Sequence, residues 1–351
     1  LIETIEKIGK PNPVFMYFFL VKALAIFSST SSHLLFSSAI LLSISNWAKY
    51  MVTKIILQHS GSLIPLKNRT LYKNKCWMYS LMLTLCFSLP VATTHYLFGQ
   101  FPPNLWHNST TILLMPFSIL LFYASLSYLR NPSNKTLAQT CILSLINLTI
   151  KPSFMFCFVI IFPIALLIQK KPLKYYIKGS LPVILSCIYI IVSHYEISTH
   201  YIGVKSNWVQ IKPFYVWTYF SKNIPLSILA STLFPLTYIL THIKRLKKDT
   251  ELLYSLSYLI VGLVIAILLT ESGDRSFHGN FTWQVNISNY MVFLVCLKRI
   301  LIPKYSAKIN HENIIKKKKG FTLSLCYLAF YIHVISGLSY LLKFILTKSF
   351  H

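Results

Sequence analysis

Acidic side chains are scarce in this chain. Only 8 of the 351 residues are Asp or Glu, whereas 34 are Lys or Arg, and the formal net charge is +26. In a soluble protein such an excess would suggest nucleic-acid binding. Here, however, there is no basic domain, zinc-finger spacing or glycine-rich phosphate loop, and the basic residues stand between apolar runs. We therefore expect no nucleic-acid partner.

Paired cysteines are missing as well. The chain has seven cysteines, and none of them forms a CxxC or other paired spacing. All seven fall in apolar runs or at their ends, which favours packed, reduced thiols over a disulfide framework or a metal site. The sequence predicts neither a metal nor a cofactor.

Long apolar runs are what the sequence has in abundance, and 54% of its residues are hydrophobic. A hydrocarbon core of ~30 Å needs about 20 apolar residues per helical crossing. The runs are continuous rather than alternating, which excludes the strands of a membrane barrel. The sequence predicts an all-α polytopic integral membrane protein with about 10 to 11 transmembrane helices. We expect a single transmembrane domain over residues 1–351, without a separate soluble domain.

Eleven segments are predicted to be helical and apolar: 13–29, 32–56, 76–99, 111–129, 137–150, 153–169, 179–195, 223–242, 252–270, 282–298 and 321–347. The pair 137–150 and 153–169 is short, and Lys151-Pro152 separates its two members. Proline ends one helix there and can begin the next.

Basic residues alternate strongly between the two sides of this topology. Connectors on one side hold 24 Lys and Arg residues, and those on the other side hold five: Lys151, Lys205, Lys212, Lys222 and Arg275. By the positive-inside rule the first side faces the cytoplasm. We expect a bacterial inner or plasma membrane location, with membrane lipids as partners and the lysine-rich stretch 303–320 touching anionic headgroups.

Function in such a chain should reside in polar residues that a membrane would otherwise reject. The first candidate is the outer loop 101–110, where Trp106 suits the interface and His107 and Asn108 offer donors and acceptors for a hydroxylated or phosphorylated ligand. It can also be read as a tight interfacial loop with an aromatic anchor and a capping Ser or Thr.

Lys151 is the second candidate. A lysine at a helix break can capture a phosphate as a compact point charge, aided by helix N-terminal amides; the alternative is that it snorkels to the interface. The third is the aromatic and basic connector 196–225, which either lies in the headgroup plane or guides a lipid-linked substrate.

The fourth candidate, 271–284, is the strongest, because it gathers two carboxylates, a guanidinium and an imidazole within eight residues. A carboxylate there could act as general base, and Arg275 could pair with phosphate in a two-pronged geometry; the alternative is an internal salt bridge that closes the loop. We predict catalytic roles for Asp274, Glu271 and His107, and substrate-binding roles for Arg275, His278, Lys151, Trp106, Asn108 and Trp283. We also expect the loops 101–110 and 271–284 to meet Lys151.

Other polar residues have simpler interpretations. Asp249 and Glu251 stand among cytoplasmic lysines and are predicted to compensate their charge. His242 and His333 are isolated on apolar helices, so packing or a hydrogen bond between helices is expected.

The many apolar helices, the polar outer loops and the helix pair broken at Lys151-Pro152 resemble the GT-C class of membrane glycosyltransferases. The architecture also resembles Wzy-type polysaccharide polymerases. The resemblance implies sugar transfer from a polyprenyl-phosphate-linked glycan on the non-cytoplasmic side. In GT-C enzymes the first outer loop usually carries an acidic residue, and the stretch Ser28 to His33 has none; no site residue is assigned from a family motif. A transporter or lipid-linked oligosaccharide flippase, or a non-catalytic assembly protein, remains the alternative.

Overall fold

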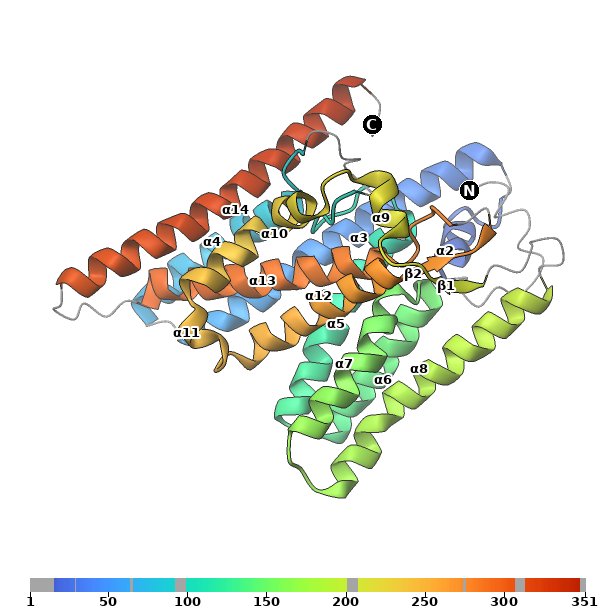
Figure 1. The fold of residues 1–351 in the computed structure, drawn as a ribbon, viewed down its shortest axis with the longest axis horizontal. Coiled ribbons are helices and arrows are strands. Elements are labelled where there is room, and N and C mark those ends of the chain that lie inside the picture. The colour runs from blue at the N-terminus through green and yellow to red at the C-terminus, as the bar shows by residue number, and fades with distance from the viewer. Residues whose placement is uncertain are drawn as a thin grey trace. The chain divides into compact units, whose positions relative to one another are not determined.

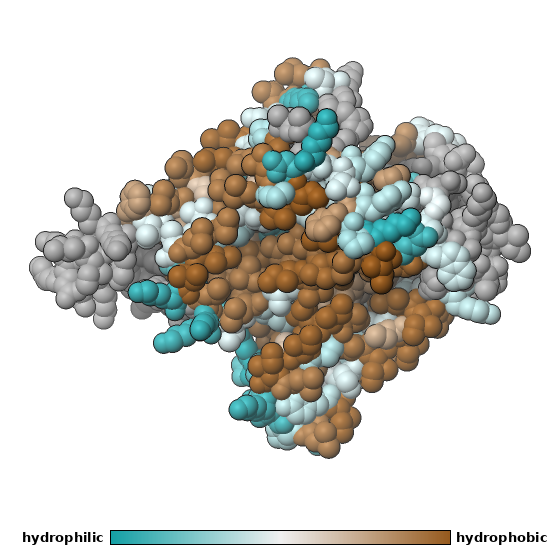
Figure 2. Space-filling model, in the orientation of Figure 1, coloured by the Kyte–Doolittle hydropathy of each residue, from teal (hydrophilic) through white to brown (hydrophobic). Residues whose placement is uncertain are grey.

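The computed structural model describes residues 16–28, 30–63, 66–91, 99–200, 208–273, 276–306 and 313–347. Most of these residues are helical, and the sheet found among them has only two short strands (Figure 1). Six helices in the described ranges are long and apolar enough to cross a membrane. Hydrophobic residues cover much of the face drawn in Figure 2, as expected for a surface in contact with lipid. The chain is therefore an all-α polytopic integral membrane protein, as predicted.

Each of the eleven predicted segments corresponds to a helix. These are α2 (Met16–Leu24), α3 (Ser31–His59), α4 (Leu66–Leu85), α5 (Ser109–Arg130), α6 (Asn134–Ile150), α7 (Ser153–Ile168), α8 (Leu173–His200), α10 (Ile224–Thr241), α12 (Thr250–Leu268), α13 (Trp283–Ser306) and α14 (Asn313–Thr347). Shorter elements connect them: η1 (Ser60–Leu63), β1 (Val209–Ile211), α9 (Tyr215–Phe220), α11 (Ile243–Leu246) and β2 (Leu269–Glu271).

Polar N-caps fix where several helices begin. Asn108, Ser133, Asn223 and Asp249 each place a side-chain oxygen on a free backbone N–H in the first turn of α5, α6, α10 and α12. A helix start has N–H groups without an intrahelical acceptor, so a short polar side chain there stabilises the boundary. The apolar runs thus set the lengths of these helices, and the caps set their first residues.

The chain divides into two compact units that are interleaved along the sequence. The first comprises residues 1–49, 106–210 and 271–284, and the second comprises residues 50–105, 211–270 and 285–351. In the first unit α5 packs on α6, and α8 packs on both α6 and α7 (Figure 1). Gly179 allows α8 to approach closely, because a Cβ there would lie 2.9 Å from a side-chain atom of Leu166 and 3.0 Å from the Tyr128 ring.

In the second unit α14 packs on α4 and α10, and here one helix prediction is wrong. The segment 76–99 was expected to be helical, but α4 ends at Leu85 and residues 86–91 are not helical. Pro90 explains the early end, because it lacks an N–H and its ring clashes with the carbonyl of Cys86 in a helix.

Neighbouring elements replace the lost helical hydrogen bonds. The Phe87 N–H donates to the His333 carbonyl (3.0 Å), and His333 Nδ1 donates to the Phe87 carbonyl (2.7 Å). The Leu89 N–H donates to the Ala230 carbonyl (3.0 Å). Irregular backbone is tolerated inside a membrane protein only where such partners exist. His333 therefore has the structural hydrogen-bonding role that the sequence predicted.

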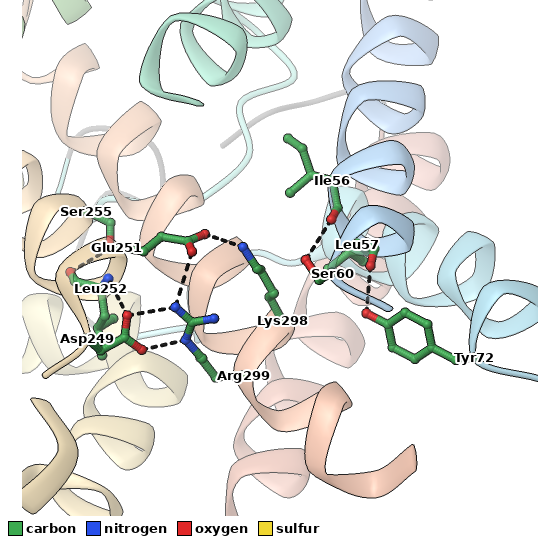
Figure 3. A network of polar contacts seen from close by, with 10 residues as sticks. All are labelled: Ile56, Leu57, Ser60, Tyr72, Asp249, Glu251, Leu252, Ser255, Lys298 and Arg299. Carbon is green, nitrogen blue, oxygen red and sulfur yellow. Dashed lines mark hydrogen bonds and ion pairs between the residues drawn. The ribbon is translucent and has the colours of Figure 1, made fainter. Parts of the chain in front are cut away.

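Two carboxylates and two cations form a compact ion-pair network in the second unit (Figure 3). Arg299 binds Asp249 through Nε–Oδ2 (2.5 Å) and Nη2–Oδ1 (2.7 Å), and Glu251 pairs with Lys298 (2.6 Å) and Arg299 (3.2 Å). Burial raises the pKa of Asp249, but hydrogen bonds from Arg299 and the Leu252 amide outweigh it, so that this pKa lies below its usual value. The predicted charge compensation is confirmed.

Replacing Glu251 by Ala should lower the free energy of unfolding by about 3–5 kcal/mol, because it leaves Lys298 buried without its carboxylate. Only 2% of the Glu251 side chain is exposed. Chemical unfolding of the purified protein in detergent measures the change. Lys244→Met, at an exposed lysine of α11, is the control and should have little effect; equal stability of both variants would contradict a stabilising network.

Candidate functional site

Lys151 lies at the junction of α6 and α7, outside both helices. Its backbone is extended (φ −169°, ψ 125°), and its N–H still donates to the Asn147 carbonyl (2.9 Å), which closes α6. Pro152 then serves as the N-cap residue of α7 without a side-chain cap bond. The Lys151 side chain is therefore fixed at the point where one helix ends and the next begins.

Three segments that are distant in sequence surround the Lys151 ammonium group. Nζ donates to Asn108 Oδ1 (3.3 Å) and to Thr111 Oγ1 (3.2 Å) at the start of α5. Nζ also lies 4.7 Å from the ring centroid of Trp283, the first residue of α13. Within about 6 Å of an aromatic face a cation is attracted by the ring quadrupole. All of these residues belong to the first unit.

Asn108 both caps α5 and contacts Lys151. Its Oδ1 accepts from the Thr111 N–H (3.1 Å), which caps α5, and from the hydroxyls of Thr110 (3.0 Å) and Thr111 (2.9 Å). The structural reading of loop 101–110 is thus correct in part: a helix cap is present, although Asn108 provides it instead of a Ser or Thr. Contact with Lys151 comes in addition to capping.

Trp283 is the aromatic wall of the cluster. It is buried, with 4% of its surface exposed, and the His107 ring lies beside it with a centroid separation of 5.7 Å and an interplanar angle of 53°. Trp106 directly precedes His107 in the loop 101–110 and is partly buried. With so little of the indole exposed, Trp283 packs against the imidazole and the ammonium group.

The environment of Lys151 is poor in compensating charge. Among the described residues it forms no ion pair, and burial lowers its pKa to about 7. Lys151 is the C-cap of α6, whose negative dipole end favours its charge, while the positive dipole ends of α5 and α7 lie beside it and favour an anion. An anion placed here would therefore draw a proton onto Lys151.

The segment 271–284 is organised by turns and by a link to the preceding connector. Glu271, the last residue of β2, accepts from Asn280 Nδ2 (2.8 Å), and Ser272 exchanges two hydrogen bonds with the Trp208 backbone (2.8 and 2.9 Å). Gly273 and Gly279 have positive φ values of 68° and 64°, which glycine adopts most easily. His278 is exposed.

Sequence reasoning placed the main members of the site correctly, but not all of them. The expected meeting of Lys151 with both loops is confirmed for Asn108 and Trp283. His107 lies beside Trp283, and the roles of all these residues remain predictions. Asp274 and Arg275 lie outside the described residues. Thr111 was missed, because nothing in the pattern shows which residue of the first turn of α5 faces the junction.

The first half of loop 101–110 takes no part in the Lys151 cluster. Residues 101–105 belong to the second unit, where Asn104 Nδ2 donates to the carbonyls of Leu83 and Cys86 (2.8 Å each) at the end of α4. These bonds are structural. A comparison with known protein families finds no matching family model, and no curated protein matches the chain, so the case for a function rests on the site itself.

Proposed function

We propose that this protein transfers a sugar from a polyprenyl-phosphate-linked donor on the outer membrane face during surface-glycan assembly. The observation that carries the proposal is the contact of Lys151 with Asn108 and Trp283 at the break between α6 and α7, with the His107 ring beside Trp283. It joins a cation with little compensation, hydrogen-bonding groups and an aromatic wall on the side of the chain that is poor in Lys and Arg.

The chemistry assigned to these groups is a substitution at the anomeric carbon. The acceptor hydroxyl forms the new bond to that carbon as the bond to the phosphate oxygen breaks, and the carrier phosphate leaves with the electron pair. Lys151 and the adjacent helix N-termini stabilise the developing negative charge. The hydroxyl proton goes to a general base, for which His107, Glu271 and Asp274 are the candidates; Arg275 and His278 are the candidates for further donor contacts.

Donor binding should weaken as the pH rises above about 7. Because the pKa of Lys151 is lowered to about 7, the ammonium form that attracts phosphate loses its proton as the pH rises past this value. A phosphodiester keeps its negative charge over the same range. We expect the Kd of a polyprenyl-phosphate sugar to rise by nearly tenfold per pH unit above 7. Isothermal titration calorimetry between pH 6 and 8.5 measures this Kd. Lys151→Arg, which stays protonated, should remove the pH dependence, and a flat profile in the native protein would contradict an anion-binding Lys151.

The function itself is tested by reconstitution. Purified protein in liposomes, supplied with a panel of short-chain polyprenyl-phosphate hexoses and a lipid-linked acceptor glycan, should release polyprenyl phosphate and extend the acceptor. Trp283→Ala should raise KM more than it lowers kcat, because it removes the ring against which the donor-binding Lys151 is held. Unaltered donor after incubation with every member of the panel would overturn the proposal.

A transporter or flippase is the second candidate, and one observation favours it. The backbone of residues 86–91 is non-helical and is held by His333 near the middle of the apolar part of α14, and broken helices are where many transporters bind their substrates. The same liposomes distinguish the two functions. A fluorescent polyprenyl-linked glycan that becomes accessible on the opposite leaflet, with its glycosidic bond intact, would favour transport.

A further inference from the structure

The α7–α8 turn in the first unit carries a dense set of exposed cations. Lys170, Lys171, Lys174 and Lys178 are all exposed, and Lys178 Nζ donates to Asn134 Oδ1 (3.0 Å) at the start of α6. Lys135 is exposed one residue further along. No acidic residue occurs in the sequence between Glu6 and Glu196. This end of the unit therefore has no nearby carboxylate in sequence to neutralise it.

The lysines gather at the start of α8. Lys174 and Lys178 are four residues apart and lie above one another on the helix, and Lys171 stands two residues before Leu173, where the helix begins. Gly179 lies on a different, buried face of α8, where its position is in close contact with Leu166 and Tyr128. The packing of α8 on α6 and α7 thus leaves all three lysines exposed, with Lys178 reaching Asn134 at the start of α6.

An apolar strip continues from these lysines along the same helix. Leu173, Ile177, Leu181, Ile184 and Ile188 are exposed by between 43% and 73% and recur at helical spacing. From Leu173 to Ile188 the helix rises by ~22 Å, more than half the thickness of a ~30 Å hydrocarbon core. Cations at one end and an exposed apolar strip beside them match a molecule with an anionic head and long hydrocarbon chains.

We propose that this surface binds an anionic phospholipid, with its phosphate on Lys171, Lys174 and Lys178 and its acyl chains along the apolar strip of α8. The lipid lies in the leaflet of the lysine-rich side of the protein. This inference does not depend on sugar transfer, because the site lies at the Arg130 end of α5, one helix length (~33 Å) from Asn108. A free phosphate would contact the lysines alone, whereas a phospholipid contacts both the lysines and the apolar strip of α8.

The test measures which lipids remain bound to the full-length protein. The protein is purified from nanodiscs of phosphatidylcholine with one-fifth phosphatidylglycerol, and retained lipid is counted by native mass spectrometry. We expect preferential retention of phosphatidylglycerol, and at least a tenfold loss of that preference in Lys171→Gln/Lys174→Gln/Lys178→Gln, since a lysine near an anionic surface contributes roughly fivefold. The matched control is Lys244→Gln/Lys247→Gln/Lys248→Gln, at three other exposed lysines, and it should keep the preference.

Four results would overturn the proposal, and three of them concern lipid retention. They are equal retention of both lipids by the native protein, an equal loss in the control triple variant, and displacement of the lipid by soluble glycerophosphoglycerol at similar concentrations. Cross-linking of two copies along α8 in the same nanodiscs would also do so, because a second chain would then cover the strip. If the glutamine variant does not fold, Lys171→Arg/Lys174→Arg/Lys178→Arg should keep the preference, and high salt should weaken it in the native protein.

Discussion

Replacing Lys151 by Met should reduce sugar transfer by about 10²–10³-fold, which is the usual effect of removing one group that stabilises developing negative charge. Methionine keeps much of the volume and apolar stem of lysine, so α6 and α7 should persist, while the attraction of the ammonium group to the Trp283 ring is lost. The ammonium group is lost, and with it the contacts to Asn108 and Thr111. Initial rates of transfer by purified protein, compared at equal amounts in liposomes, measure the effect.

Lys212 offers a matched control for this variant. It is exposed, and its Nζ lies 4.9 Å from the ring centroid of Tyr215, so Lys212→Met also removes one positive charge and one contact of a cation with a ring. An exposed contact of this kind contributes little, and the rate should stay within about twofold of the native value. Equal rates in Lys151→Met and the native protein would remove Lys151 from the mechanism.

The second large effect is expected at Gly337 of α14. A Cβ at this position would overlap the carbonyl oxygen of Leu85, the last residue of α4. The obstacle is backbone and cannot rotate away, so Gly337→Ala should lower the free energy of unfolding by about 3 kcal/mol or more, at the upper end of overpacking effects. Thermal unfolding in detergent, followed by size-exclusion chromatography, measures the loss.

Gly320 lies on the same helix and is the control. Nothing lies within 4 Å of a Cβ placed there, so Gly320→Ala should be neutral or stabilise the helix by up to about 1 kcal/mol through its higher helix propensity. If both variants unfold at the same temperature as the native protein, then α4 does not end against α14 as described.

The sequence predicted the helices well because length and hydropathy are strong signals for membrane segments. All eleven segments correspond to helices, and the boundary at Lys151-Pro152 is where proline placed it. The end of α4 was missed although Pro90 marks it, because the apolar run continues past Leu85 and hides the break. The partners that hold residues 86–91 come from α10, α14 and the loop at Asn104, and a sequence does not show which distant segments will supply them.

The candidate site was predictable to the extent that it depends on topology. Alternating connectors place Asn108, Lys151 and Trp283 at the same side of the chain, which suggested that they could meet but did not require it. Whether Thr111 contacts Lys151 depends on how α5 is rotated about its own axis. Several residues in the first turn of α5 are polar, so the sequence does not show which of them faces Lys151. Local polarity likewise does not distinguish a helix cap from a ligand contact, and Asn108 is shared between these uses.

Because Asn108 has other donors besides Lys151, the lysine can move toward an anion without opening the helix cap. Asn108 Oδ1 accepts from four donors, namely Lys151 Nζ, Thr110 Oγ1, and the N–H and hydroxyl of Thr111. When Lys151 swings toward an incoming negative charge, three donors stay on that oxygen and the first turn of α5 remains closed. The cap of α5 therefore does not depend on Lys151, and only the lysine side chain has to rearrange when an anion binds.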